Sequence, residues 1–233
     1  MSSTLEAPKP QGDFKIPEPG NYQAICYKVV VIGKVWEPFK KTGQMNLVPK
    51  IQIYWELPTE LRNGREGEPQ VPHTVNEMFR KSSSEKSNLY KLIFSWSNGL
   101  INQKNIGNFD LKKLLGMQCL LTVVHNPSKT DPTKKFLKMA GVAALPKGMK
   151  PLKQINPKTF FDTELFDQEE FNKLSSFTRG KIVESEEFKA LKLDPVKVQA
   201  IANAKYEPKG DDENVETGFA PEVSDEEAAT AGW

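Results

Sequence analysis

Residues 51–57 alternate strictly between apolar and polar side chains, and this alternation constrains the fold more than any other feature of the chain. A period of two places successive side chains on opposite faces of a β-strand, so the segment predicts a half-buried strand. Four further segments predict strands because β-branched and aromatic residues are frequent in them and turn-forming residues bound them. They are residues 22–32, 71–80, 118–125 and 135–145, of which 71–80 is the weakest.

The hydrophobic period changes between the third and fourth predicted strands. Leu89, Leu92, Ile93 and Trp96 recur at the spacing of one helical face, and Ser84 or Ser87 can cap the helix that they predict. A second short helix over residues 109–116 ends at a glycine. The order is therefore β-β-β-α-β-β, which favours a mainly β fold with a five-stranded OB-fold-like barrel. The same order also fits an α+β sandwich.

The remaining segments give the predicted domain organisation. Residues 1–20 are proline-rich and predict an extended N-terminal segment, followed by the OB-fold nucleic-acid-binding domain over 21–150. Within that domain, residues 34–47 and 58–70 predict loops because proline and glycine interrupt them. Residues 151–206 predict a helical extension with helices over 167–177 and 185–193, either packed on the barrel or mobile; its aromatic residues favour packing. Residues 207–233 predict a disordered acidic tail.

Charge divides the chain more sharply than its net value of +2 suggests. Residues 211–233 hold eight carboxylates and no lysine or arginine, so residues 1–210 carry 32 basic against 22 acidic side chains, a net charge of +10. The whole excess lies in residues 1–150, with 22 basic and 12 acidic side chains. A basic body of this kind favours an anionic partner such as nucleic acid.

Several functional classes find no support in the sequence. The two histidines and two cysteines lack the spacing of a zinc site, and Cys26 and Cys119 predict buried, reduced thiols. No phosphate-binding loop, dinucleotide fingerprint or nucleophile elbow occurs. We therefore expect no cofactor, no catalytic site and no metal site, and we expect that the protein is not an enzyme. No apolar run is long enough for a membrane helix and no secretion signal is evident, so we expect no membrane partner and a cytoplasmic location.

Two predicted loops combine cations with aromatic side chains, the composition that single-stranded nucleic acid requires. Cations follow the phosphates, and aromatic faces stack on unpaired bases. In an OB-fold these two loops flank the binding face. The candidate DNA-binding residues are Lys34, Trp36, Phe39, Lys40 and Lys41 in the first loop, Lys129, Lys134, Lys135 and Phe136 in and beside the second, and Tyr54, Phe79, Arg80 and Lys81 on the strands. The sequence leaves two positions for Tyr54: on this binding face, or covered by the C-terminal helices.

The acidic tail predicts two roles. A tethered polyanion competes with nucleic acid for a cationic groove, because tethering raises its effective concentration. Asp225, Glu226, Glu227 and Trp233 also predict a docking peptide, in which the aromatic residue enters a pocket of a partner and the acids steer its approach.

The chain resembles phage and bacterial single-stranded DNA-binding proteins in its strand order, its basic and aromatic loops and its acidic tail with an aromatic end. Short stretches are similar to a group of phage-encoded proteins of this kind: residues 19–22, 53–58, 86–89, 109–111, 115–116, 123–125 and 145–148. The resemblance covers about residues 17–150 and the tail. Two features depart from it: the bacterial tail tip has Ile-Pro-Phe where this chain has Ala-Gly-Trp, and the segment 151–206 has no counterpart in the simple bacterial protein.

These patterns predict a protein that binds single-stranded DNA without sequence preference, and the resemblance implies that it is phage-encoded. Its role would be DNA replication, recombination or repair in the host cytoplasm, with replication or recombination proteins recruited by the tail and possible homo-oligomers. Two alternatives remain open. One is a protein-interaction adaptor with an OB-like domain, and the other is a metal-dependent nucleic-acid-processing enzyme, which the scattered aspartates of residues 1–150 argue against.

Overall fold

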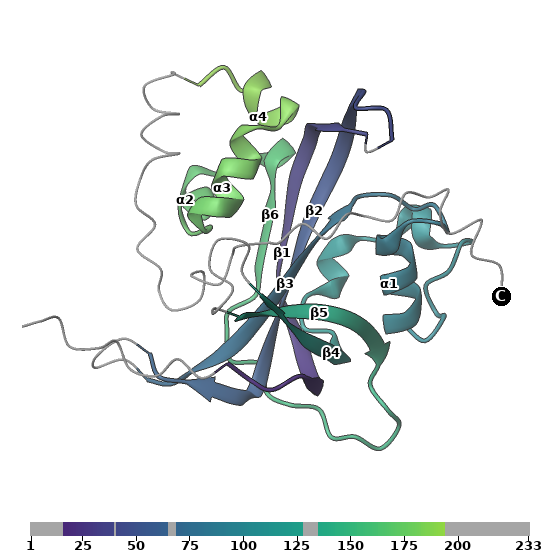
Figure 1. Ribbon diagram of the computed structural model, residues 1–233, viewed down its shortest axis with the longest axis vertical. Coiled ribbons are helices and arrows are strands. Elements are labelled where there is room, and N and C mark those ends of the chain that lie inside the picture. Colours follow the sequence, from purple (N-terminus) through teal and green to yellow (C-terminus); the bar gives the residue numbers. More distant parts are fainter. Residues whose placement is uncertain (1–15, 40, 65–68, 128–134, 194–233) are drawn as a thin grey trace, which may run out of the picture.

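The computed structural model describes residues 16–39, 41–64, 69–127 and 135–193. Five strands pair in antiparallel fashion in the order β3-β2-β1-β4-β5, and a sixth, β6, pairs in parallel with β1 (Figure 1). The predicted mainly β fold is therefore confirmed. The strands are β1 (Gly20–Pro38), β2 (Met45–Arg62), β3 (Val71–Arg80), β4 (Gln118–Pro127), β5 (Lys135–Ala144) and β6 (Thr159–Asp162).

The sheet is open. The two strands at the ends of the path, β3 and β5, contact each other, but no ladder of hydrogen bonds joins them in the described part of the chain. A closed barrel is therefore not confirmed, although the helical material lies between β3 and β4 as the sequence predicts.

Helix α1 (Asn88–Trp96) covers one face of the sheet. Ser87 caps it, since its side chain accepts a hydrogen bond from the Tyr90 N–H at 3.1 Å. The predicted apolar face of the helix packs on the inward side chains of β2, and the Trp55 and Trp96 rings lie 5.8 Å apart. Two 3₁₀ turns, η1 (Ile106–Asn108) and η2 (Leu111–Leu114), follow α1 where the sequence predicts one short helix.

The C-terminal extension, residues 159–193, covers the other face of β1 and β2 (Figure 1). Residues 24–33 of β1 are consequently buried on both faces. Val30 and Ile32 pack against Phe161, Phe171 and Phe188 of the extension. Packing of the extension, which its aromatic residues favoured, is thus confirmed. After β6 it contains η3 (Thr163–Leu165), α2 (Gln168–Asn172), α3 (Ser176–Val183) and α4 (Glu186–Ala190).

Several local predictions are wrong. Residues 58–62, predicted as part of a loop, continue strand β2. Residues 34–47 are largely strand, because β1 continues to Pro38 and β2 starts at Met45, so that cross-strand pairing extends through polar sequence. The extension contains three short helices instead of two, because Ser175 and Ser185 each cap the start of a new helix. It also contains strand β6, which was not predicted. Strand β6 is only four residues long and its partner lies more than 100 residues away, so no local pattern predicts it.

Candidate nucleic-acid interface

The hairpin of β1 and β2 extends as an arm, of which the structure describes residues 34–39 and 41–49 (Figure 1). Trp36 pairs with Leu47 and Pro38 pairs with Met45. Alternate residues of paired strands share a face, so these four side chains lie on one face of the arm. Trp36 is 51% exposed, Met45 50%, Leu47 38%, and Phe39 at the turn 37%.

The opposite face of the arm is buried at its base, although Asn46 nearer the turn is exposed. Val35 and Val48 are buried, and Val35 packs in the cluster that the extension forms with β1. The Lys50 ammonium on this face lies 2.8 Å from a carboxylate oxygen of Glu37. The arm therefore offers its large apolar side chains to solvent on one face, which we call the arm face: Lys34, Trp36, Pro38, Met45, Leu47 and Pro49.

Several predicted cations lie on or beside the arm. The Lys34 side chain is half exposed on the arm face, and Lys41 is exposed in the turn. At the base of the arm, Arg80 pairs with Lys50, and the Lys81 N–H donates to the Pro49 carbonyl at 2.7 Å. The structure thus brings Arg80 and Lys81 next to the arm, as an extended interface requires. Lys40 lies outside the described residues.

Tyr54 and Phe79 do not face solvent, which corrects their assignment to the interface. The Tyr54 hydroxyl is 2.7 Å from the Thr178 hydroxyl of α3, and Thr178 donates to the Gln52 side chain at 3.0 Å. Tyr54 is therefore covered by the C-terminal helices, one of the two positions expected for it. Phe79 belongs to the core beneath α1. Neither ring can stack on a base without repacking.

The strand ends that flank the second predicted loop lie away from the arm. Strand β4 pairs with the first residues of β1, Gly20 opposite Val123, whereas the arm contains the last residues of β1. Lys135 and Phe136 start β5 beyond this point, with Lys135 exposed and Phe136 partly buried. The register thus places the arm and the strand ends that flank the second predicted loop at opposite ends of β1. Lys129 and Lys134 lie outside the described residues, as do the tail residues Asp225, Glu226, Glu227 and Trp233.

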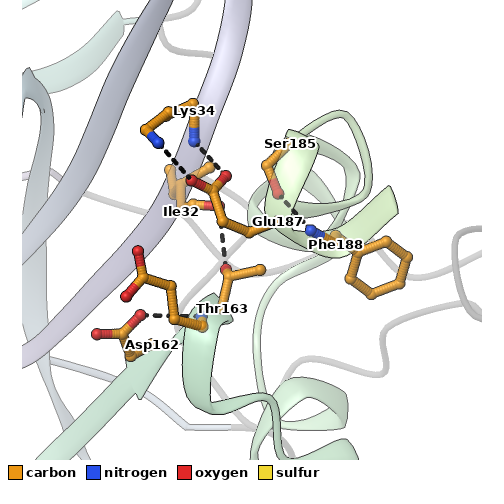
Figure 2. Close-up of polar contacts among 8 residues, drawn as sticks. Ile32, Lys34, Asp162, Thr163, Ser185, Glu187 and Phe188 are labelled. Carbon is orange, nitrogen blue, oxygen red and sulfur yellow. Dashed lines mark hydrogen bonds and ion pairs between the residues drawn. The ribbon is translucent and has the colours of Figure 1, made fainter. Parts of the chain in front are cut away.

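Helix α4 brings two carboxylates to the arm that the sequence did not identify, those of Glu186 and Glu187. Figure 2 shows the Glu187 carboxylate beside Lys34. The Lys34 N–H donates to Glu187 Oε2 at 2.7 Å, and the Lys34 ammonium lies 3.7 Å from Glu187 Oε1. The neighbouring Glu186 accepts hydrogen bonds from Lys189 and from the Trp36 side chain, which lower the pKa of Glu186. Met45 and Leu47 were also missed, although their alternation with polar residues is a detectable strand signal.

Buried titratable groups lie away from the arm face and serve the fold. Burial raises the pKa of Glu56, even though its carboxylate accepts the Ile155 and Asn156 N–H groups, both at 2.7 Å. Burial, with the charge of Arg62, lowers the pKa of His73 to about 4. Burial also raises the pKa of the Cys26 and Cys119 thiols, which are free and unreactive in this state.

Within the described ranges, no three His, Cys, Asp or Glu side chains gather closely enough to hold a metal ion. Nor does that part of the chain contain a helix of the length and apolarity needed to cross a membrane. No family model matches the chain, and no curated protein or solved structure shows a significant similarity to it.

Proposed function

We propose that this protein binds single-stranded DNA without sequence preference, and that the arm face is its principal contact surface. One observation carries the proposal: Trp36, Phe39, Met45 and Leu47 are all exposed within twelve residues, next to Lys34 and Lys41. Exposed apolar side chains in such a cluster mark a binding surface. Aromatic residues beside cations suit unpaired bases and their phosphates, at about 1–3 kcal/mol per stacked base.

The fold supports the same proposal. Strand β1 lies between β2 and β4, with β3 and β5 at the ends of the path and in contact with each other. We interpret this arrangement as a partly open OB-fold barrel, in which the hairpin of the first two strands flanks bound oligonucleotide. The arm is that hairpin. In this interpretation the C-terminal extension covers part of the sheet, so DNA contacts concentrate on the arm and on Arg80 and Lys81 at its base.

The proposed biological role is that of a phage-encoded, non-enzymatic protein that coats DNA during replication, recombination or repair in the host cytoplasm. The acidic tail would compete for the cationic surface and recruit replication or recombination proteins. Support for the tail's role comes from charge alone, since eight carboxylates follow a body of net charge +10.

Fluorescence anisotropy with labelled oligo-dT, a duplex of equal length and an RNA of equal length tests the proposal. We expect oligo-dT to bind more tightly than the duplex, because stacked pairs withhold their faces from Trp36. Affinity should fall steeply with salt, because each neutralised phosphate releases counterions. Equal affinity for single strand and duplex, or a response independent of salt, would contradict the proposal.

Protein recognition is a second candidate, because Met45 and Leu47 are apolar without being aromatic and suit a protein surface as well as a base. Tryptophan fluorescence separates the two. Trp55 and Trp96 are buried, so with Trp233 replaced by phenylalanine the signal that responds to ligand comes from Trp36. Stacking on oligo-dT quenches this signal, whereas an adaptor leaves it unchanged. Incubation of labelled DNA with Mg²⁺ or Mn²⁺ tests for cleavage.

A further inference from the structure

The Glu187 carboxylate contacts both the main-chain N–H and the ammonium group of Lys34, a residue of the arm. Its Oε2 accepts the Lys34 main-chain N–H at 2.7 Å, while its Oε1 lies 3.7 Å from the Lys34 ammonium. Figure 2 shows this carboxylate between the two nitrogen atoms of Lys34. The Lys34 N–H lies on the edge of β1 that faces away from β2. It comes just after the residues that pair with β6 and after Val31 and Ile32, whose carbonyls are hydrogen-bonded to the Thr163 hydroxyl.

The position of Glu187 is fixed by local structure. Ser185 caps α4 by accepting the Phe188 N–H at 3.2 Å, and the Phe188 ring is buried against β1. Gly33 allows the close approach, since a Cβ at this residue would lie 2.5 Å from Glu187 Oε2 and 3.0 Å from Ser185 Cβ. The carboxylate is therefore held against the arm by packing as well as by charge.

A phosphodiester group fits the same two donors. Like a carboxylate, it carries one negative charge and offers two oxygen acceptors, and main-chain N–H groups together with lysine are frequent phosphate contacts. The Lys34 side chain is 54% exposed, so a phosphate can reach its ammonium from solvent. Trp36 lies two residues further along the same face, where the adjoining base can stack, while Glu186 holds its side chain.

We propose that the Lys34 N–H and ammonium form a phosphate subsite of the arm, and that Glu187 occupies this subsite until a single strand displaces it. The inference rests on the proposed DNA-binding function and adds the residues of one subsite and its internal competitor. Displacement frees the Lys34 N–H and ammonium for phosphate, next to Trp36, which is already exposed to the adjoining base. Helix α4 thereby links the C-terminal extension to nucleic-acid binding.

The substitution Glu187→Gln tests the competitor directly. Its amide oxygen still accepts the Lys34 N–H, so the arm stays anchored, but the charge that attracts the ammonium is lost. We expect oligo-dT affinity at low salt to rise about two- to fivefold, the range for an ion pair whose lysine is exposed to solvent. The slope of log affinity against log salt should steepen by about 0.7, the value for one additional phosphate on a single strand. In a Lys34→Gln background, Glu187→Gln should have no effect.

Glu184→Gln is the matched control, because it makes the same charge change in the same extension and its carboxylate pairs with Lys181 at 3.0 Å instead of the arm. If Glu187→Gln binds no more tightly than Glu184→Gln, the subsite inference is overturned while the binding of wild-type protein to oligo-dT still supports the proposed function. If wild-type protein does not bind oligo-dT, both are overturned.

A measurement on the wild-type protein covers the case in which Glu187→Gln unfolds. The Lys34 amide should change its ¹H–¹⁵N chemical shift as oligo-dT is titrated, because its acceptor changes from carboxylate to phosphate. The Lys173 amide, which donates to the Glu170 carbonyl at 3.2 Å within the extension, serves as an internal reference. A Lys34 amide that shifts no more than this reference would overturn the subsite.

Discussion

Trp36 is the side chain on which the proposed interface depends most, because it presents the largest exposed aromatic surface on the arm. Other aromatic residues of the chain have structural roles. Trp55 and Trp96 pack against each other in the core, and the Tyr54 hydroxyl is hydrogen-bonded to Thr178 of α3. A residue type therefore does not identify a base-stacking position. The proposal for Trp36 rests instead on its exposure on the arm face.

Substitution of Trp36 by alanine should weaken oligo-dT binding about tenfold or more, since a stacked base contributes about 1–3 kcal/mol. Trp36→Phe should retain most of the affinity. Phe94→Ala is the control, because Phe94 is an exposed aromatic residue on α1 that stacks on Tyr90 away from the arm. Equal losses in the alanine variants, measured by anisotropy, would show that the arm face is not the contact surface.

His73 predicts how stability responds to pH. Its pKa in the folded protein, about 4, lies below the ordinary value of 6.5, so the unfolded chain binds more protons between these limits. The contribution of His73 is complete above pH 6.5 and is lost as pH falls toward 4, with a slope of up to about 1.4 kcal/mol per pH unit. Urea unfolding across this range measures it.

The variant His73→Gln should flatten that slope, because the titrating group is absent. His125→Gln should leave it in place; His125 is the other histidine of the chain, and its ring is hydrogen-bonded to the Pro17 carbonyl at 2.8 Å. An unchanged slope in His73→Gln would assign the pH dependence to other groups.

At the scale of elements, β1 joins the parts of the molecule. Its residues 20–25 pair with β4, and its residues 25–38 pair with β2 and end in the arm. Strand β6 pairs with residues 28–31. Antiparallel strands commonly leave one face to solvent, yet β1 is buried on both because the extension covers its second face. The arm begins where this double burial ends, next to the irregularity between Val31 and Gly33.

Gly33→Ala should destabilise the protein for two reasons. Gly33 has φ +99°, which an alanine adopts only with strain, at a cost of about 1–3 kcal/mol, and the added Cβ meets Glu187 and Ser185. Gly148→Ala separates these effects, because Gly148 has φ +85° and no atom lies within 4 Å of a Cβ built there. Thermal and urea unfolding should show a larger loss for Gly33→Ala than for Gly148→Ala. Equal losses would show that the contact with α4 contributes nothing.

The order of elements was largely predictable, and the arm and extension were not. Alternation identified β2 because its inward residues face the core beneath α1. The same rule failed for residues 34–38. There Trp36 and Pro38 face solvent, and with the proline the segment resembles a loop. Of the candidate site, the predicted Lys34 and Trp36 do lie together on the arm. Glu187 had no local signal, because its contact joins residues 153 positions apart.

At the scale of the whole molecule, charge separates the parts of the chain that composition averages. Residues 1–210 have a net charge of +10, and the last 23 residues carry eight carboxylates. A tethered polyanion acts at a high local concentration, so in the proposed function even weak contacts of the tail with the basic surface compete with DNA.

Deletion of residues 211–233 should therefore tighten oligo-dT binding, most strongly at low salt where screening is weakest. A matched control keeps the length and replaces the eight carboxylates with amides; it should match the deletion if charge is the cause. Anisotropy titrations at several salt concentrations measure both. Unchanged or weaker binding after deletion would contradict competition by the tail.

The sequence by itself determined the β-rich class, the position of α1 and the contrast between basic body and acidic tail. These follow from periodicity and composition, which act over a few residues or over whole segments. Only the tertiary structure decided that residues 34–49 form an arm, that the extension buries Tyr54, and that Glu187 meets Lys34. Each of these depends on contacts between residues that are distant in the chain. The energy of such a contact depends on which surfaces pack together, so no local sequence pattern predicts it.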